Sequence, residues 1–285
     1  MIERSALSLG ARAILGTAIP AFILTVLTII ALFPLVWMAY SSLKPYAALY
    51  SFPPRFGFDD LGLHYYRAVL ESTPFLAFLK SSTIVALGST IFGTMFAAMA
   101  AYVLARACFR GSTALSKLLL IAYIFPPILI AIPLFLVVNK VGLANTWVGL
   151  ILVHIAYTFP FSTWMLISFF ARIPIELEEA ARIDGAGNVV VFVKVALPLV
   201  APGLVTVAVF AFISSWNEFL LALIILGAGD NRTLSVGLYS LVGGEFAQWG
   251  TAMAATTLAI LPTLILFLLI QHRIAAGLTA GAVKG

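Results

Sequence analysis

Long apolar runs dominate this sequence and limit what it can fold into. Six stretches each hold about 20 or more mostly apolar residues, enough for a helix to cross a hydrocarbon core of roughly 30 Å. They cover residues 13–40, 75–105, 116–138, 147–170, 199–226 and 252–271. Charged residues make up only 9% of the chain, against about 25% in soluble domains. The sequence therefore predicts an all-α integral membrane protein with six transmembrane helices in one domain, residues 1–285.

The basic residues predict how these spans are oriented. The first run has no small-residue cleavage site, so we interpret it as a retained helix rather than a signal peptide. If the N-terminus is cytoplasmic, ten of the 16 Lys and Arg residues lie on the cytoplasmic side, in keeping with the positive-inside rule. We then expect both termini in the cytoplasm. Segments 41–74 and 227–250 become long extracytoplasmic segments, either connectors or an external docking surface.

Several kinds of chemistry are missing from the sequence. The single cysteine, Cys108, excludes an internal disulfide, and the three histidines have no metal-ligand spacing. His154, in the fourth span, is interpreted as a hydrogen-bonded packing residue. The chain has no phosphate-binding glycine loop followed by Lys-Ser/Thr, and no soluble segment large enough for an enzyme domain. We therefore expect no catalytic residues, bound cofactor, metal or nucleic acid on this chain.

A charged segment, residues 174–198, interrupts the apolar sequence between the fourth and fifth spans. Pro174 suits the start of a helix, and Glu176, Glu178 and Glu179 complement the dipole of its first turns. Glu178 and Arg182 are spaced to pair along that helix. Gly185 and Gly187 end it, and we expect a second short helix from 189 to 197, capped by Asn188 and stopped by Pro198. The pair either lies in the lipid headgroups or binds a protein; its acidic first helix favours a protein.

This segment carries a family resemblance. Glu179-Ala180-Ala181, Gly185, Val195 and Leu197-Pro198 stand at the spacing of the signature of ABC-importer permeases, with Val195 where isoleucine is usual. The resemblance implies that the first short helix is a coupling helix, which docks in a cleft of an ATPase subunit. Closure of two ATPases on ATP and Mg would then move it and rock the transmembrane helices. It assigns ATPase coupling to Glu179, Ala180, Ala181, Asp184 and Gly185.

Three further stretches resemble the carbohydrate branch of this family, in particular the smaller permease of maltose-type transporters. They are residues 215–223 in the fifth span, Phe125-Pro126-Pro127 with Pro133 in a kinked third span, and the C-terminal residues 277–285. The resemblance implies a permease in the cytoplasmic membrane of a prokaryote, which imports a sugar, as a di- or oligosaccharide, by alternating access. Its partners would be a second homologous permease, two ATPase subunits, an extracytoplasmic sugar-binding protein and the membrane lipid.

Polar residues inside the fifth span are candidates for the translocation path. A carboxylate at mid-bilayer costs about 2.5–3.5 kcal/mol on insertion scales, so Glu218 should face protein or water. Trp216 offers a stacking face to a sugar, and Asn217 and Glu218 offer hydrogen bonds. The alternative is that Glu218 pairs with a polar group on a neighbouring helix and fixes packing.

Two further sites follow from the resemblance alone. It implies a loop that contacts the binding protein, at Gly243, Gly244, Glu245, Phe246 and Gln248. It also implies that the flexible tail 275–285 reaches the ATPases through Thr279, Gly281 and Lys284.

Three other functions have to be weighed against this one. A secondary transporter usually needs several intramembrane carboxylates, and this chain has one. A permease for a non-sugar solute would carry the same coupling signature. A polytopic membrane enzyme would need paired acids or a metal constellation, which the sequence lacks.

Overall fold

The computed structural model describes residues 3–53, 57, 60–106, 111–227, 229, 231–242 and 248–282. All regular elements in this described part of the chain are helices, which divide into two compact units. Unit 1, residues 1–73 and 245–258, holds α1 (Glu3–Ser41), α2 (Tyr46–Leu49), α3 (His64–Ser72) and the first part of α14 (Trp249–Ala282). Unit 2, residues 74–244 and 259–285, holds α4 (Phe75–Arg106), α5 (Ser112–Ile124), α6 (Pro127–Lys140), α7 (Trp147–Phe170), α8 (Ile175–Ile183), α9 (Asn188–Val190), the π-helical η1 (Val191–Ala196), α10 (Leu197–Leu199), α11 (Ala201–Asn217), α12 (Leu220–Leu226), α13 (Leu234–Val242) and the rest of α14.

Unit 1 consists of a long apolar helix followed by a folded connection. Residues 18–41 of α1 have a mean hydropathy of 2.6, and none of the most apolar window is buried within the chain. The segment expected as a long connection, 41–74, folds into α2 and α3. Tyr65 of α3 packs against Gly250, where a β-carbon would overlap the tyrosine ring. Burial raises the pKa of the Tyr65 phenol.

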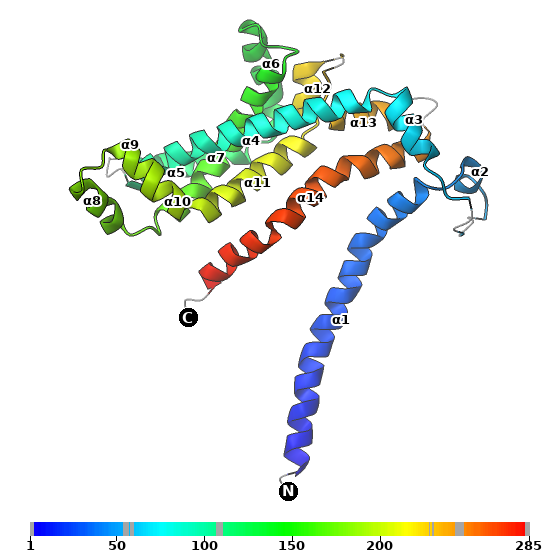
Figure 1. Ribbon diagram of the computed structural model, residues 1–285, viewed down its shortest axis with the longest axis horizontal. Helices are drawn as coiled ribbons and strands as arrows, with labels where there is room; N and C mark the ends of the chain where they lie inside the picture. The colour runs from blue at the N-terminus through cyan, green and yellow to red at the C-terminus, as the bar shows by residue number, and fades with distance from the viewer. Residues whose placement is uncertain are drawn as a thin grey trace. The chain divides into compact units, whose positions relative to one another are not determined.

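Unit 2 is built around α4, α7 and α11, which pack along one another (Figure 1). The buried face of α4 carries small residues, among them Ser89, Gly93, Ala97 and Ala101. Small residues let helix backbones approach closely where lipid supplies no hydrophobic driving force between helices. Figure 1 shows α8, α9 and α10 at one end of this bundle and α12 and α13 at the other.

Each end of the bundle has its own apolar core. At the α8 end, residues such as Ala101, Leu166 and Phe170 are fully buried together with Ala196 of η1. At the other end, Leu150 of α7 is buried among residues of α6 and α12. These cores hold the connections at either end of the bundle in place.

The number of helices that could span a membrane supports the expected fold class in its general features. Four helices of the described chain are long and apolar enough to cross a membrane: residues 18–41, α4, α7 and residues 249–271 of α14. The number rises to six if each bent helix pair counts as one span. The prediction of a multi-pass, all-helical protein is confirmed, whereas the count of six depends on how the broken helices are read.

The third predicted span is broken rather than mildly kinked. Its halves, α5 and α6, meet at an angle of 99°. Phe125 and Pro126 have extended backbone angles, and Pro127 begins α6. A proline at the first helical position needs no amide hydrogen, and the residue before a proline is disfavoured in helical conformation. The two consecutive prolines therefore set the position of the break.

Two helix ends differ from the sequence-based expectation. The helical segment after the glycine turn begins at Asn188, with Gly187 as its N-cap, and continues past Pro198 to Leu199. Proline is tolerated there because the preceding turn, η1, is a wider π-helix, in which the Leu197 amide bonds to the carbonyl of Phe192. The tail expected to be flexible from 275 is helical as far as Ala282, in an alanine-rich sequence of high helix propensity.

Candidate functional site

The surface of α8 contains the residues that the sequence assigns to ATPase coupling. Pro174 is the N-cap of this helix, so the helix begins at Ile175, one position after the predicted start at Pro174. Glu179, Ala180, Asp184 and Gly185 are exposed, and Ala181 is half-buried. Ile183 beside them is 86% exposed, an unusual state for a large aliphatic side chain. The structure therefore brings these five residues together on one mixed acidic and apolar surface, which we call the α8 surface.

A glycine turn ends α8. Gly185 has φ +87°, and its amide donates to the carbonyl of Arg182, while the amide of Ala186 donates to that of Ala181. These two bonds form a Schellman motif, in which the residue after the cap adopts the left-handed conformation. A β-carbon at Gly185 would meet no atom within 4 Å. Backbone conformation, not crowding, therefore requires glycine at this position.

Replacing Gly185 tests that requirement. We expect Gly185→Ala to loosen the end of α8, because a left-handed residue with a β-carbon costs about 1–2 kcal/mol. Gly185→Asn should be tolerated better, since asparagine visits this region more often. Retention of a bound ATPase in a pull-down, measured beside the melting temperature, should fall in the order wild type, Asn, Ala. Equal retention by all three variants would contradict a conformational role.

Glu178, on the opposite side of α8, is fully buried and forms a cluster that the sequence did not predict. Its carboxylate accepts bonds from Arg106 Nε at 2.8 Å and Tyr102 Oη at 2.8 Å, both on α4. Arg182 Nη2 lies 3.5 Å from the same carboxylate, so the expected pair within α8 is present as a longer contact. Arg106 Nη2 also donates to the carbonyl of Ile173 at 3.0 Å. We call Glu178, Arg106 and Tyr102 the α8 latch.

A second buried polar cluster interrupts the fifth span. Glu218 ends α11 in an extended conformation, and its carboxylate accepts the amide hydrogens of Leu221 and Ala222, each at 2.8 Å. It thereby caps the first turn of α12. His154 Nε2 lies 3.4 Å from Glu218 Oε2. The other ring nitrogen of His154 bonds to Ser215 at 2.6 Å, so His154 is a buried, hydrogen-bonded residue as expected.

The other two candidates for the translocation path differ from each other in exposure. Trp216 is 5% exposed, and its indole donates to the carbonyl of Ala259 at 3.2 Å. Its ring stacks on Phe212 with centroids 5.5 Å apart, so in this conformation one face is covered. Asn217 is exposed, and its amide bonds to the carbonyl of Ile213 within its own helix. Asn217 is therefore the more accessible of the two to a passing solute.

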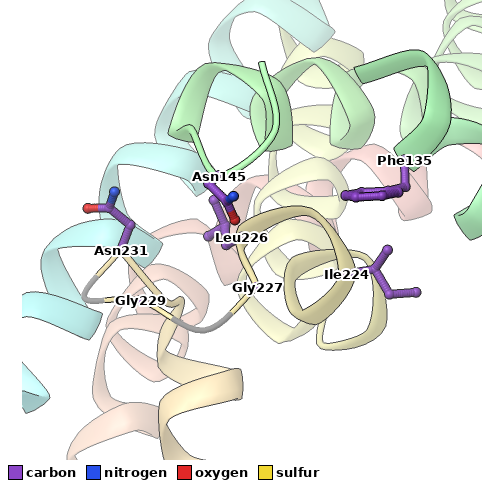
Figure 2. Close-up of a pocket in the computed structure, with 7 residues that line it drawn as sticks. All are labelled: Phe135, Asn145, Ile224, Leu226, Gly227, Gly229 and Asn231. Carbon is purple, nitrogen blue, oxygen red and sulfur yellow. The ribbon is translucent and has the colours of Figure 1, made fainter. Parts of the chain in front are cut away.

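A pocket of about 360 Å³ lies at the end of unit 2 opposite α8. Figure 2 shows Asn145 and Leu226 at its centre, with Phe135 and Ile224 to one side and Asn231 to the other. The turn before α7 is held there by a hydrogen bond from the backbone amide of Asn145 to the backbone carbonyl of Ile225, at 2.9 Å. The amide side chains of Asn145 and Asn231 in the lining of this pocket suit contact with polar partners.

The remaining predicted site residues are described only in part. Gly243, Gly244, Glu245 and Phe246 of the expected binding-protein loop lie outside the described residues, as does Lys284 of the tail. Gln248 is exposed and precedes α14. Thr279 and Gly281 lie on the helical backbone of α14.

Comparison with known proteins assigns the family. The family model for binding-protein-dependent transport system inner membrane components matches residues 90–279, more than half of the chain. The sulfoquinovosyl glycerol transport system permease of Agrobacterium fabrum is 38% identical over 262 residues, 92% of each chain. The trehalose transport system permease of Mycobacterium tuberculosis is 38% identical over 260 residues, 90% of this chain and 93% of that one.

A solved structure supports the same fold. A chain of a bacterial ABC transporter that imports the acidic polysaccharide alginate superposes with a TM-score of 0.79 at 22% identity, covering 92% of this chain and 97% of that one. The resemblance first indicated by residues 179–198 is confirmed. This chain belongs to the binding-protein-dependent transport system inner membrane components, the permeases of ABC importers.

Proposed function

We propose that this chain is a sugar-importing permease subunit whose α8 surface docks on an ATPase. The observation that carries this proposal is the α8 surface itself, an exposed acidic and apolar helix that ends in a Schellman glycine. On its buried side, the Glu178 carboxylate binds Arg106 of α4. ATP and Mg bind the partner ATPases and not this chain. The coupling residues are Glu179, Ala180, Ala181, Asp184 and Gly185.

Six spans and cytoplasmic termini fit the contacts within unit 2. The C-terminal end of α4 meets α8 through Arg106 and Glu178, which agrees with both connections being cytoplasmic. The turn before α7 meets the end of α12 through Asn145 and Ile225, which agrees with both being extracytoplasmic. Each of the two bent helix pairs, α5 with α6 and the helical segment Asn188–Leu199 with α11, then counts as one span.

Two surfaces suit the remaining partners. An apolar groove of about 820 Å³ runs between α4, η1 and α11 and is lined by Met95, Met99, Val193 and similar residues. It offers a surface for the second permease. The pocket at Asn145 and Asn231 offers a surface for the extracytoplasmic binding protein. The residues at 243–248 stay a proposed contact for the same partner on the family resemblance alone. The family's description as binding-protein-dependent supports that partner.

A sugar is the solute class that the relatives favour. The two similar permeases are named for transport of sulfoquinovosyl glycerol and of trehalose. Asn217 and Glu218 provide amide and carboxylate groups suited to sugar hydroxyls. The solute is therefore proposed to be a di- or oligosaccharide, with most selectivity exerted by the binding protein.

Reconstitution tests this function. The chain, co-expressed with a second permease and the ATPase subunits of the same organism, should take up at least one disaccharide from a radiolabelled panel into proteoliposomes. Uptake should require internal ATP and the external binding protein. Uptake of an amino acid or phosphate in place of every sugar would show a permease for another solute. Uptake driven by an ion gradient without ATP would show a secondary transporter.

A further inference from the structure

Three elements meet at the α8 latch. Glu178 belongs to α8, Arg106 and Tyr102 belong to the last turns of α4, and the carbonyl of Ile173 lies just after α7. The Glu178 side chain has no exposed surface, and that of Arg106 is 15% exposed. One guanidinium thus binds the docking helix and the end of α7 at the same time.

The latch links α8 to α4 through side chains. The backbone of α8 packs mainly against η1, which follows it in the chain. The ring of Tyr102 lies against Phe170 of α7 and Phe192 of η1, with centroids 5.5 and 5.0 Å apart. These aromatic contacts restrict the position from which the Tyr102 hydroxyl reaches Glu178.

A buried ion pair of this kind is poorly explained by stability alone. Replacing such a pair with apolar residues of similar volume is often neutral or stabilising, because desolvation offsets the attraction. What the pair adds is direction, since the short bonds from Arg106 and Tyr102 fix the carboxylate in one place. A directional contact can transmit a displacement that a smooth apolar contact would absorb by sliding.

We propose that Glu178 is a positioning residue, which locks α8 to the end of α4 so that displacement of α8 by its ATPase moves α4. This inference rests on the proposed docking of α8. Further along α4, Ser89 lies 3.0 Å from Ser215, which bonds to His154. Movement of α4 therefore reaches the polar cluster at Glu218.

Spin labels on α4 and α6 test the latch without a sugar. Leu76 on α4 and Val141 just after α6 are exposed, 58% and 62%, and accept cysteine substitutions in a Cys108→Ser background. In the importer purified with its ATPases, ATP with vanadate should shift the distance distribution between the two labels. The shift should be lost in Arg106→Gln. It should persist in the matched control Arg182→Gln, which removes the longer, half-exposed contact to the same carboxylate.

A second variant separates positioning from folding. The double replacement Glu178→Met with Arg106→Met should keep the melting temperature and the bound ATPases, because an apolar pair fills the same space. It should nevertheless lose the distance shift. A full distance shift in this double variant or in Arg106→Gln would overturn the proposal. A wild-type importer that holds its ATPases but shows no distance shift would overturn it as well. Failure of the wild-type chain to retain any ATPase would instead refute the proposed function.

Discussion

Reversing the charge of Glu179 is expected to release the chain from its ATPases. Glu179 is exposed on the α8 surface, beside the buried Glu178 and within the acidic first turns of the helix. If it meets a basic group in the ATPase cleft, Glu179→Lys places like charges together. We expect retention of the ATPase to fall at least about 30-fold, the effect of losing about 2 kcal/mol at an interfacial charge.

A matched control is available on α3. Glu71 is also an exposed helical glutamate, 69% accessible, with only a weak contact of 3.9 Å to Arg67. It lies in the segment expected outside the cell, so Glu71→Lys makes the same chemical change away from the proposed ATPase contact. Quantitative pull-down of both variants, with expression and melting temperature measured alongside, decides the matter. Equal ATPase retention by Glu179→Lys and Glu71→Lys would show that α8 does not dock.

Local sequence predicted much of the fold. Apolar runs located α4, α7 and the membrane part of α14, and the Pro126-Pro127 pair located the break in the third span. Gly185 ended α8 where the sequence placed its end. Each of these features depends on residues close together in the chain, because apolar length, the fixed φ of proline and the conformational freedom of glycine act over a few residues.

The α8 latch depends on contacts between distant residues. Arg106 and Glu178 are 72 positions apart, so no local pattern in the sequence pairs them. The local spacing pairs Glu178 with Arg182, but it does not predict that Glu178 is buried while Glu176 and Glu179 are exposed. The spacing of the glutamates along α8 is compatible with several rotations of the helix about its own axis. Only packing of α8 against η1 determines which carboxylate faces the bundle.

For Glu218, the sequence identified the residue but not its role. The sequence identified an intramembrane carboxylate and left open whether it lines a path or fixes packing. The structure shows how it fixes packing, as the cap of α12 and a partner of His154. Its side chain is still 12% exposed, and the neighbouring Asn217 is open. Both roles therefore remain compatible with its position, and the translocation path remains a proposal.

Substitutions at Glu218 and Asn217 separate these roles. Glu218→Leu should destabilise the chain strongly, since two amide hydrogens of α12 lose their acceptor at about 1–3 kcal/mol each. Glu218→Gln keeps one acceptor oxygen, so the importer should assemble and show reduced uptake. Asn217→Ala breaks only a bond within α11 and should leave the melting temperature unchanged. If Asn217 lines the path, this variant lowers sugar uptake in proteoliposomes without loss of bound ATPase. Unchanged uptake kinetics in both Asn217→Ala and Glu218→Gln would leave Glu218 with the capping role alone, because a group that contacts the solute during passage cannot be altered without changing its rate.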